Sequence, residues 1–162
     1  MFNLRRMSEA ERIIARFQLQ PLPREGGWFR RVAVSAERHS DGRPVFSFIH
    51  FLMTPRGFSA IHRLKSEEAW EFIAGAPVEL WIGGADGTAE SFRLSAEIGG
   101  AGRPTALVPA GAWQGARTTG EWSLLGCQVT PAWEEAEFAL GQQEELLRVF
   151  PAHAAIIRAL TR

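Results

Sequence analysis

Hydrophobic and polar residues alternate in short runs through most of the chain between residues 28 and 130. The runs are separated by turn-forming pairs such as Asp41-Gly42 and Gly83-Gly84. This pattern predicts about eight to ten short strands. Because helices do not alternate with these strands, a parallel α/β fold is not favoured.

Helical patterns are confined to the two ends of the chain. Near the N-terminus, Ser8 and Glu11 have the spacing of a capping box, and an apolar stripe follows to about Gln18. Near the C-terminus, residues 142–150 and the segment that begins at Pro151 each place apolar side chains on one face. We therefore predict an all-β sandwich or barrel with short N-terminal and C-terminal helices, in a single domain spanning residues 1–162.

The stretch of residues 57–75 carries the most informative polar side chains. With a period of two, His62 lies on an apolar face of one strand, and Glu68 shares a face of the next strand with Trp70 and Phe72. A histidine and a carboxylate on facing strands can form half of a metal site or an acid/base pair. The alternative is a core histidine with its hydrogen bonds satisfied and a solvated glutamate at a turn.

Five further residues are assigned to a pocket or to a structural role. Arg30, beside a tryptophan on its strand face, suits an anionic or planar ligand, or alternatively lies exposed over that tryptophan. His50 is either a pocket histidine or a buried one bonded to backbone, and Gln114 lies among small residues that leave room beside it. Glu25 is expected to cap or hydrogen-bond a glycine turn, and Cys127 is expected to be inert core.

The composition argues against several classes of partner. The 18 Lys and Arg residues balance 18 Asp and Glu residues, so no net charge attracts nucleic acid or an anionic membrane. No apolar run approaches the roughly 20 residues of a membrane helix, and residues 1–6 are not followed by the apolar segment of a secretory signal. One cysteine cannot form an internal disulfide, and a reducing cytoplasm is the expected compartment.

Two stretches resemble, in spacing, the paired motifs of the cupin superfamily. The first motif is a glycine, His-x-His, a glutamate after three or four residues and a glycine six residues further on. Its counterpart here is Gly57, His62-Arg63-Leu64, Glu68 and Gly75. The second is Gly, Pro-x-Gly, two residues, His, three residues and Asn, and its counterpart is Gly102, Pro109-Ala110-Gly111, Gln114 and Thr118. Leu64 and Gln114 stand where the motifs have histidine, and Thr118 stands where they have asparagine.

Other motifs are similar to those of the small single-domain cupins of family five, a group of uncharacterised proteins. The resemblance covers about residues 10–161. It implies a double-stranded β-helix barrel, commonly a homodimer, with the shape of the dTDP-sugar epimerases, but it says little about the reaction. The matching residues are Pro23-x-Glu25-Gly26-Gly27-Trp28-Phe29-Arg30, His62-Arg63-Leu64-Lys65-Ser66-x-Glu68-x-Trp70, Pro109-Ala110-Gly111-x-Trp113-Gln114, Gly126-Cys127 and the stretch from Leu140-Gly141 to Leu160.

Three functions are compatible with these residues. The favoured one is a metal-free barrel that binds a small polar, sugar-like molecule and isomerises it, with His62 as a base tuned by Glu68. The alternative is an enzyme that uses a divalent transition metal held by His62, Glu68 and Gln114. The third is a non-catalytic binding or structural module. In the favoured barrel, the residues of the ligand pocket are Arg30, His50, Trp70, Phe72 and Gln114.

Overall fold

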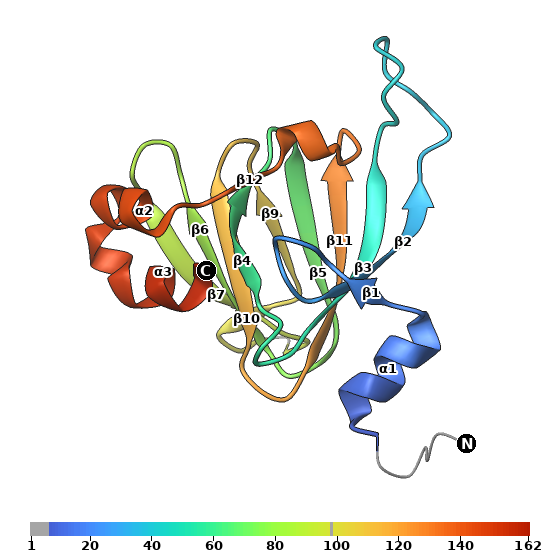
Figure 1. Ribbon diagram of the computed structural model, residues 1–162, viewed down its shortest axis with the longest axis horizontal. Coiled ribbons are helices and arrows are strands. Elements are labelled where there is room, and N and C mark those ends of the chain that lie inside the picture. Colours follow the sequence, from blue (N-terminus) through green and yellow to red (C-terminus); the bar gives the residue numbers. More distant parts are fainter. Residues whose placement is uncertain (1–6, 98) are drawn as a thin grey trace.

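The computed structural model describes residues 7–97 and 99–162 of the chain. Its strands form two six-stranded sheets that face each other, and helices lie on the outside of both (Figure 1). The predicted all-β architecture with helices at the two ends is confirmed. Within the described ranges, no helix is both long and apolar enough to cross a membrane.

The first sheet contains β5, the strand that carries Glu68. Each of its strands runs antiparallel to its neighbours. In spatial order the strands are β1 (Gln20–Pro21), β2 (Trp28–Val34), β3 (Ser47–Met53), β11 (Ser123–Thr130), β5 (Glu67–Gly75) and β9 (Thr105–Val108).

The second sheet contains β4, the strand that carries His62, and β10, in which Gln114 lies directly across from His62. All its pairs are antiparallel except β7 with β8. The two-residue strand β8 follows a bend, and residue 98 lies outside the described residues. In spatial order the strands are β12 (Ala139–Leu140), β4 (Ser59–Arg63), β10 (Trp113–Thr118), β6 (Val78–Gly83), β7 (Ala89–Leu94) and β8 (Gly102–Arg103).

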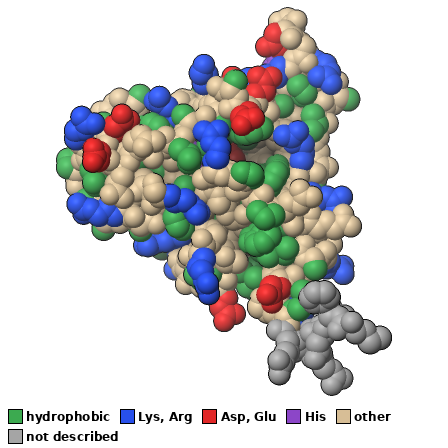
Figure 2. All heavy atoms as spheres, in the orientation of Figure 1, with side chains coloured by type: hydrophobic (Ala, Val, Ile, Leu, Met, Phe, Trp, Pro, Cys, Tyr) green, Lys and Arg blue, Asp and Glu red, His purple; other side chains and the backbone are tan. Residues whose placement is uncertain are grey.

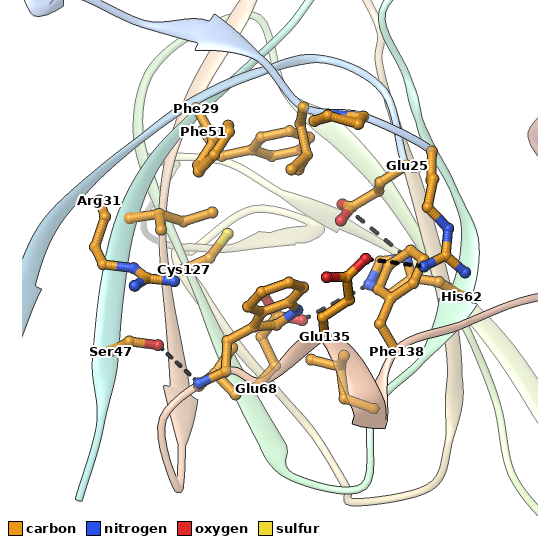
Figure 3. A pocket seen from close by; sticks show the side chains of 17 residues that line it. Glu25, Phe29, Arg31, Ser47, Phe51, His62, Glu68, Cys127, Glu135 and Phe138 are labelled. Carbon is orange, nitrogen blue, oxygen red and sulfur yellow. Dashed lines mark hydrogen bonds and ion pairs between the residues drawn. The ribbon is translucent and has the colours of Figure 1, made fainter. Parts of the chain in front are cut away.

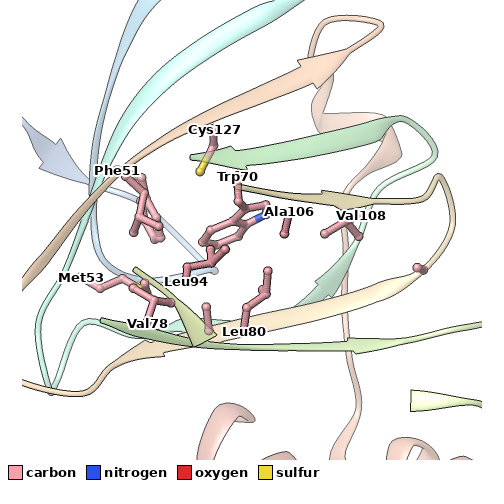
Figure 4. Packing of buried hydrophobic residues seen from close by; sticks show 12 residues of the cluster. Phe51, Met53, Trp70, Val78, Leu80, Leu94, Ala106, Val108 and Cys127 are labelled. Carbon is pink, nitrogen blue, oxygen red and sulfur yellow. The ribbon is translucent and has the colours of Figure 1, made fainter. Parts of the chain in front are cut away.

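The main hydrophobic core fills the space between the sheets (Figure 4). It is built from alternate positions of the strands, such as Trp70 in β5 and Leu80 in β6, both of which are fully buried. Burying one such large side chain stabilises the fold by about 1.5–3 kcal/mol. The inward face of each strand is therefore the face that the alternation makes apolar.

An N-terminal helix covers the outer face of the first sheet. This helix, α1 (Glu9–Phe17), begins with the predicted capping box, because Ser8 and Glu11 each accept a hydrogen bond from the other's backbone N–H. Its apolar stripe packs on Leu52 and Leu124, whose side chains point away from the space between the sheets.

C-terminal helices cover the outer face of the second sheet. They are α2 (Gln143–Val149), η3 (Pro151–His153) and α3 (Ala154–Leu160), and they pack over Ile61 and Trp81. A shorter element, η2 (Glu135–Glu137), lies in the segment that joins β11 of the first sheet to β12 of the second.

Candidate functional site

A cavity of about 290 Å³ lies between the two sheets beside the core (Figure 3). Much of its wall is apolar, with Phe29, Ile49, Phe51 and Val129 among the lining residues. Figure 2 shows a hollow in one face of the molecule, bordered by charged and hydrophobic side chains. The volume is near the lower end of the range of about 300–1,000 Å³ for ligand sites, so the cavity suits a small molecule.

His62 is the buried polar group at one side of this cavity. The alternation of β4 places it on the inner face, where it is 2% exposed. Its Nδ1–H donates to the carbonyl oxygen of Ala60 at 2.8 Å, which leaves Nε2 facing the cavity wall at Glu68. Phe138 covers one face of the imidazole, with ring centroids 5.2 Å apart and planes inclined by 20°. The ring is therefore held in one orientation.

Two carboxylates flank the imidazole. Glu68 Oε2 is 3.9 Å from Nε2 of His62, and Glu25 Oε1 is 4.0 Å from Nδ1. Glu25 precedes Gly26 and Gly27, whose φ angles of 111° and 70° suit glycine and turn the chain into β2. Its backbone oxygen accepts from the N–H of Ala60, and its carboxylate accepts from the Ser59 hydroxyl at 2.7 Å. β4 thus holds both His62 and the loop that supplies Glu25.

Burial and neighbouring charges have opposite effects on the pKa values of this cluster. Burial alone would lower the pKa of His62, but the negative charges of Glu25 and Glu68 raise that pKa to about 9. Burial raises the pKa of the Glu25 carboxyl, and the charge of His62 offsets only part of this rise. At neutral pH the imidazole is therefore an imidazolium, which donates hydrogen bonds and a proton.

A buried chain of hydrogen bonds holds Glu68. The indole N–H of Trp70 donates to Gln114 Oε1 at 2.7 Å, and Gln114 Nε2 donates to Glu68 Oε2 at 2.7 Å. The indole can only donate and the carboxylate can only accept, so the amide of Gln114 has one possible orientation. Gln114 and Trp70 therefore lie behind Glu68, where they position it.

Of the residues predicted for the site, His62 and Glu68 line the cavity. Gln114, Trp70 and Phe72 are not among its lining residues. Gln114 and Trp70 lie behind Glu68 and hold it through hydrogen bonds, and Phe72 packs against the core.

Arg30 and His50 do not line the cavity, and their prediction as pocket residues is corrected here. Arg30 donates to Gln18 and to the carbonyl oxygen of Phe17, and the ring of His50 meets Phe17 edge-on at 5.6 Å. Both residues lie on the outer face, toward α1, because the strand face that also carries Trp28 packs against this helix.

Several residues of the cavity were missed by the sequence reasoning. Glu25 was expected only to support the glycine turn, although it belongs to the motif quoted above. No local sequence pattern marks Arg31, Ser47 or Trp133 as cavity residues. Only the packing of the two sheets brings them together. Cys127 also lines the cavity, but burial raises the pKa of its thiol well above the ordinary value, so it remains an unreactive thiol.

The side chains predicted as metal ligands do not fit a metal ion. Gln114 turns its N–H group, not its oxygen, toward Glu68, and its oxygen accepts from Trp70. The predicted set is thereby reduced to Nε2 of His62 and the Glu68 carboxylate, because Nδ1 of His62 donates to the carbonyl oxygen of Ala60. Among residues 7–97 and 99–162, no group of three or more His, Cys, Asp or Glu side chains is placed to hold a metal ion.

Known proteins similar to this chain share its fold over almost its entire length. A crystal structure of a protein from Shewanella oneidensis has 31% identity and a TM-score of 0.88, with 96% of this chain and 99% of that chain covered. A hypothetical protein from Leishmania major has 29% identity and a TM-score of 0.85, with 95% and 99% covered.

More distant similarity shows the fold alone. The oxalate decarboxylase of Lactobacillus farciminis, solved as a formate complex, has 12% identity and a TM-score of 0.55, with 91% of this chain and 43% of that chain covered. A search of the curated proteins found no match. The family model described as "Cupin superfamily (DUF985)" matches residues 11–141. This chain therefore belongs to the DUF985 family of the cupin superfamily.

Proposed function

We propose that this chain is a small-molecule-binding cupin that transfers protons on an oxygenated ligand, as isomerases and epimerases do. The observation that carries the proposal is the buried imidazole of His62, which lies between two carboxylates at the wall of a largely apolar cavity. Ionisable groups with shifted pKa values in a cavity are typical of acid/base sites. The roles we assign are acid for His62 and base for Glu25.

Glu25 is suited to take a proton from the carbon next to a ligand carbonyl group. Its raised pKa makes it a stronger base than an exposed glutamate. The electron pair of the broken C–H bond moves to the carbonyl oxygen, and the N–H of His62 stabilises the resulting enolate. Return of the proton to the other face gives an epimer. Proton transfer at a neighbouring carbon gives an isomer, and neither outcome needs an oxidant or a reductant.

Glu68 has a positioning role in this mechanism. Together with Glu25 it keeps His62 charged near neutral pH, which assigns His62 as the acid and not as the base expected from the sequence. The hydrogen bonds from Gln114 and Trp70 keep the Glu68 carboxylate in place.

Proton exchange in D2O tests the proposal directly. The protein is incubated with a panel of small ketones and keto sugars, and loss of the α-proton signals is followed by NMR. We expect His62→Gln and Glu25→Gln each to slow exchange by about 10²–10⁴-fold. Arg30→Gln, on the outer face of the first sheet, is the control that retains the rate. Equal rates for wild type and both site variants would refute the proposal.

A non-catalytic binding protein is the second candidate, and the predominantly apolar wall of the cavity favours it. The same panel separates the two functions. Ligand-dependent chemical shift changes in the protein, without exchange of ligand protons, would support the binding protein.

A further inference from the structure

We infer that the cavity takes a small, largely apolar carboxylate whose acid group binds Arg31 and Ser47 and whose other end lies at His62. This inference names the ligand class of the same cavity, so it rests on the proposed function. It differs from the sugar-like ligand expected from the sequence.

Arg31 is the one charged residue of the cavity wall that has no partner within the described residues. His62 lies between Glu25 and Glu68, and Arg24 lies 4.0 Å from Glu135. Among residues 7–97 and 99–162, no hydrogen bond or ion pair is made by the guanidinium of Arg31. The residue lines the cavity and is exposed to solvent. A guanidinium left free at a cavity wall favours a carboxylate, which it can bind through two parallel hydrogen bonds.

Ser47 adds a second donor to the cavity wall. It is 3% exposed, and its Oγ accepts the backbone N–H of Trp133 at 3.0 Å. Since a hydroxyl has one proton to donate and Oγ is here used as acceptor, that proton is available to a ligand. No acceptor for it is present in the described part of the chain.

The pairing of β2 with β3 brings these two donors to the same face. Arg31 pairs with Ile49, and Ser47 lies two residues from Ile49, so its side chain points to the same side. Such diagonal neighbours are within reach of a long side chain. The register shifts between Arg31 and Ala33, and a bulge of this kind is a common way to redirect a side chain near a site.

The rest of the cavity matches an apolar ligand body. Figure 3 shows Arg31 and Ser47 at one side, His62 at the other, and Cys127 between them. Ile49, Phe51 and Val129 supply apolar wall. A sugar would bury hydroxyl groups against these side chains without hydrogen-bond partners, which is unfavourable. A flat or branched apolar acid with a carbonyl group at its far end fits this arrangement. Its carboxylate would bind Arg31 and Ser47, its body would contact the apolar wall, and its carbonyl oxygen would accept from His62.

A matched pair of probes tests this inference. We would titrate 4-acetylbenzoate and its uncharged amide, 4-acetylbenzamide, into the isotope-labelled protein and follow backbone chemical shifts. We expect the acid to bind wild type roughly tenfold more tightly than the amide, as one charge-assisted contact predicts. Arg31→Gln should remove most of this preference, and Ser47→Ala a smaller part. Arg30→Gln, which removes the same charge from the opposite face of the same strand, should retain it.

Three results would overturn the inference. They are equal affinities of the two probes for wild type, an unchanged preference in Arg31→Gln, and no binding of the acid at millimolar concentration. Exchange of the acetyl protons in D2O reports separately on the proposed function. Binding of the acid through Arg31 without exchange would contradict proton transfer alone, and exchange with no preference for the acid would contradict the ligand class alone.

Discussion

Two clusters of charged residues in this molecule, one around Arg43 and one around His62, shift the pKa of a carboxyl group in opposite directions. Arg43 donates through Nε to the carbonyl oxygen of Ala132 at 2.7 Å, and through Nη1 to Glu137 at 2.8 Å. Hydrogen bonding to Arg43 lowers the pKa of Glu137, which in turn raises that of Arg43. In the cluster around His62, by contrast, the effect of burial outweighs the charge of His62, and the pKa of Glu25 is raised.

The difference separates a structural ion pair from the cluster to which we assign proton transfer. The pair of Arg43 and Glu137 is hydrogen-bonded and holds the segment that supplies Trp133 and Phe138 to the cavity. The contacts of His62 with its carboxylates are 3.9 and 4.0 Å long, which is longer than a hydrogen bond. Burial of the Glu25 carboxylate is unfavourable, and ionisable groups with shifted pKa values are typical of functional sites.

The largest effect is expected from breaking the Arg43 cluster. Arg43→Ala leaves Glu137 and the carbonyl of Ala132 without their donor, and should lower the free energy of unfolding by about 3 kcal/mol, measured by urea denaturation. Arg117→Ala removes an arginine from the exposed pair with Glu79 and should cost less than about 1 kcal/mol. Similar losses for the two variants would contradict the comparison.

The next effect is a pH dependence of stability that originates at His62. Its pKa is about 9 in the folded protein and 6.5 without the fold, so its contribution is complete below about pH 6.5 and is lost as the pH rises to about 9. Wild type should lose up to about 3 kcal/mol of stability across this window relative to His62→Gln. Urea denaturation at several pH values measures the difference, and parallel pH profiles of the two proteins would contradict it.

A smaller loss is expected at Gln114. Gln114→His deprives Trp70 or Glu68 of one hydrogen-bond partner and should cost about 1–3 kcal/mol. Metal analysis after dialysis is the second readout. We expect wild type to keep less than one equivalent of a divalent metal and the variant to keep no more. Full metal occupancy in wild type would instead support the metal-dependent enzyme.

The smallest effect on stability is expected at Glu25. Glu25→Gln removes a carboxylate whose burial is unfavourable while Glu68 remains beside His62, so the free energy of unfolding should change by less than about 1 kcal/mol. The pKa of His62, measured by NMR titration, should nevertheless fall from about 9 toward 6.5. Glu135→Gln, at the exposed edge of the cavity, is the control that leaves the His62 pKa unchanged. An unchanged pKa in Glu25→Gln would show that Glu25 does not act on His62.

Much of the fold and part of the site could be predicted from the sequence, because the signals involved are local. Alternation and turn residues predicted most of the strands, and the spacing of Ser8 and Glu11 predicted the first helix. The same alternation placed His62 and Glu68 on inner faces, and both line the cavity. Gln114 was predicted to lie beside them, but only the structure shows that its amide is committed to Trp70 and Glu68.

The sequence by itself determined the family, the two-sheet architecture and the face that each strand residue shares with its neighbours. It did not determine which face of β2 and β3 points inward. Alternation shows which side chains share a face, but it does not show which of the two faces another element covers. Packing of α1 directs Arg30 and His50 outward and leaves Arg31 and Ser47 in the cavity. The tertiary structure also brings Glu25 from a loop to His62, since a backbone hydrogen bond to Ala60 joins segments that are distant in the chain. The charge of the site depends on that contact, and contacts between distant segments leave no periodic trace in a sequence.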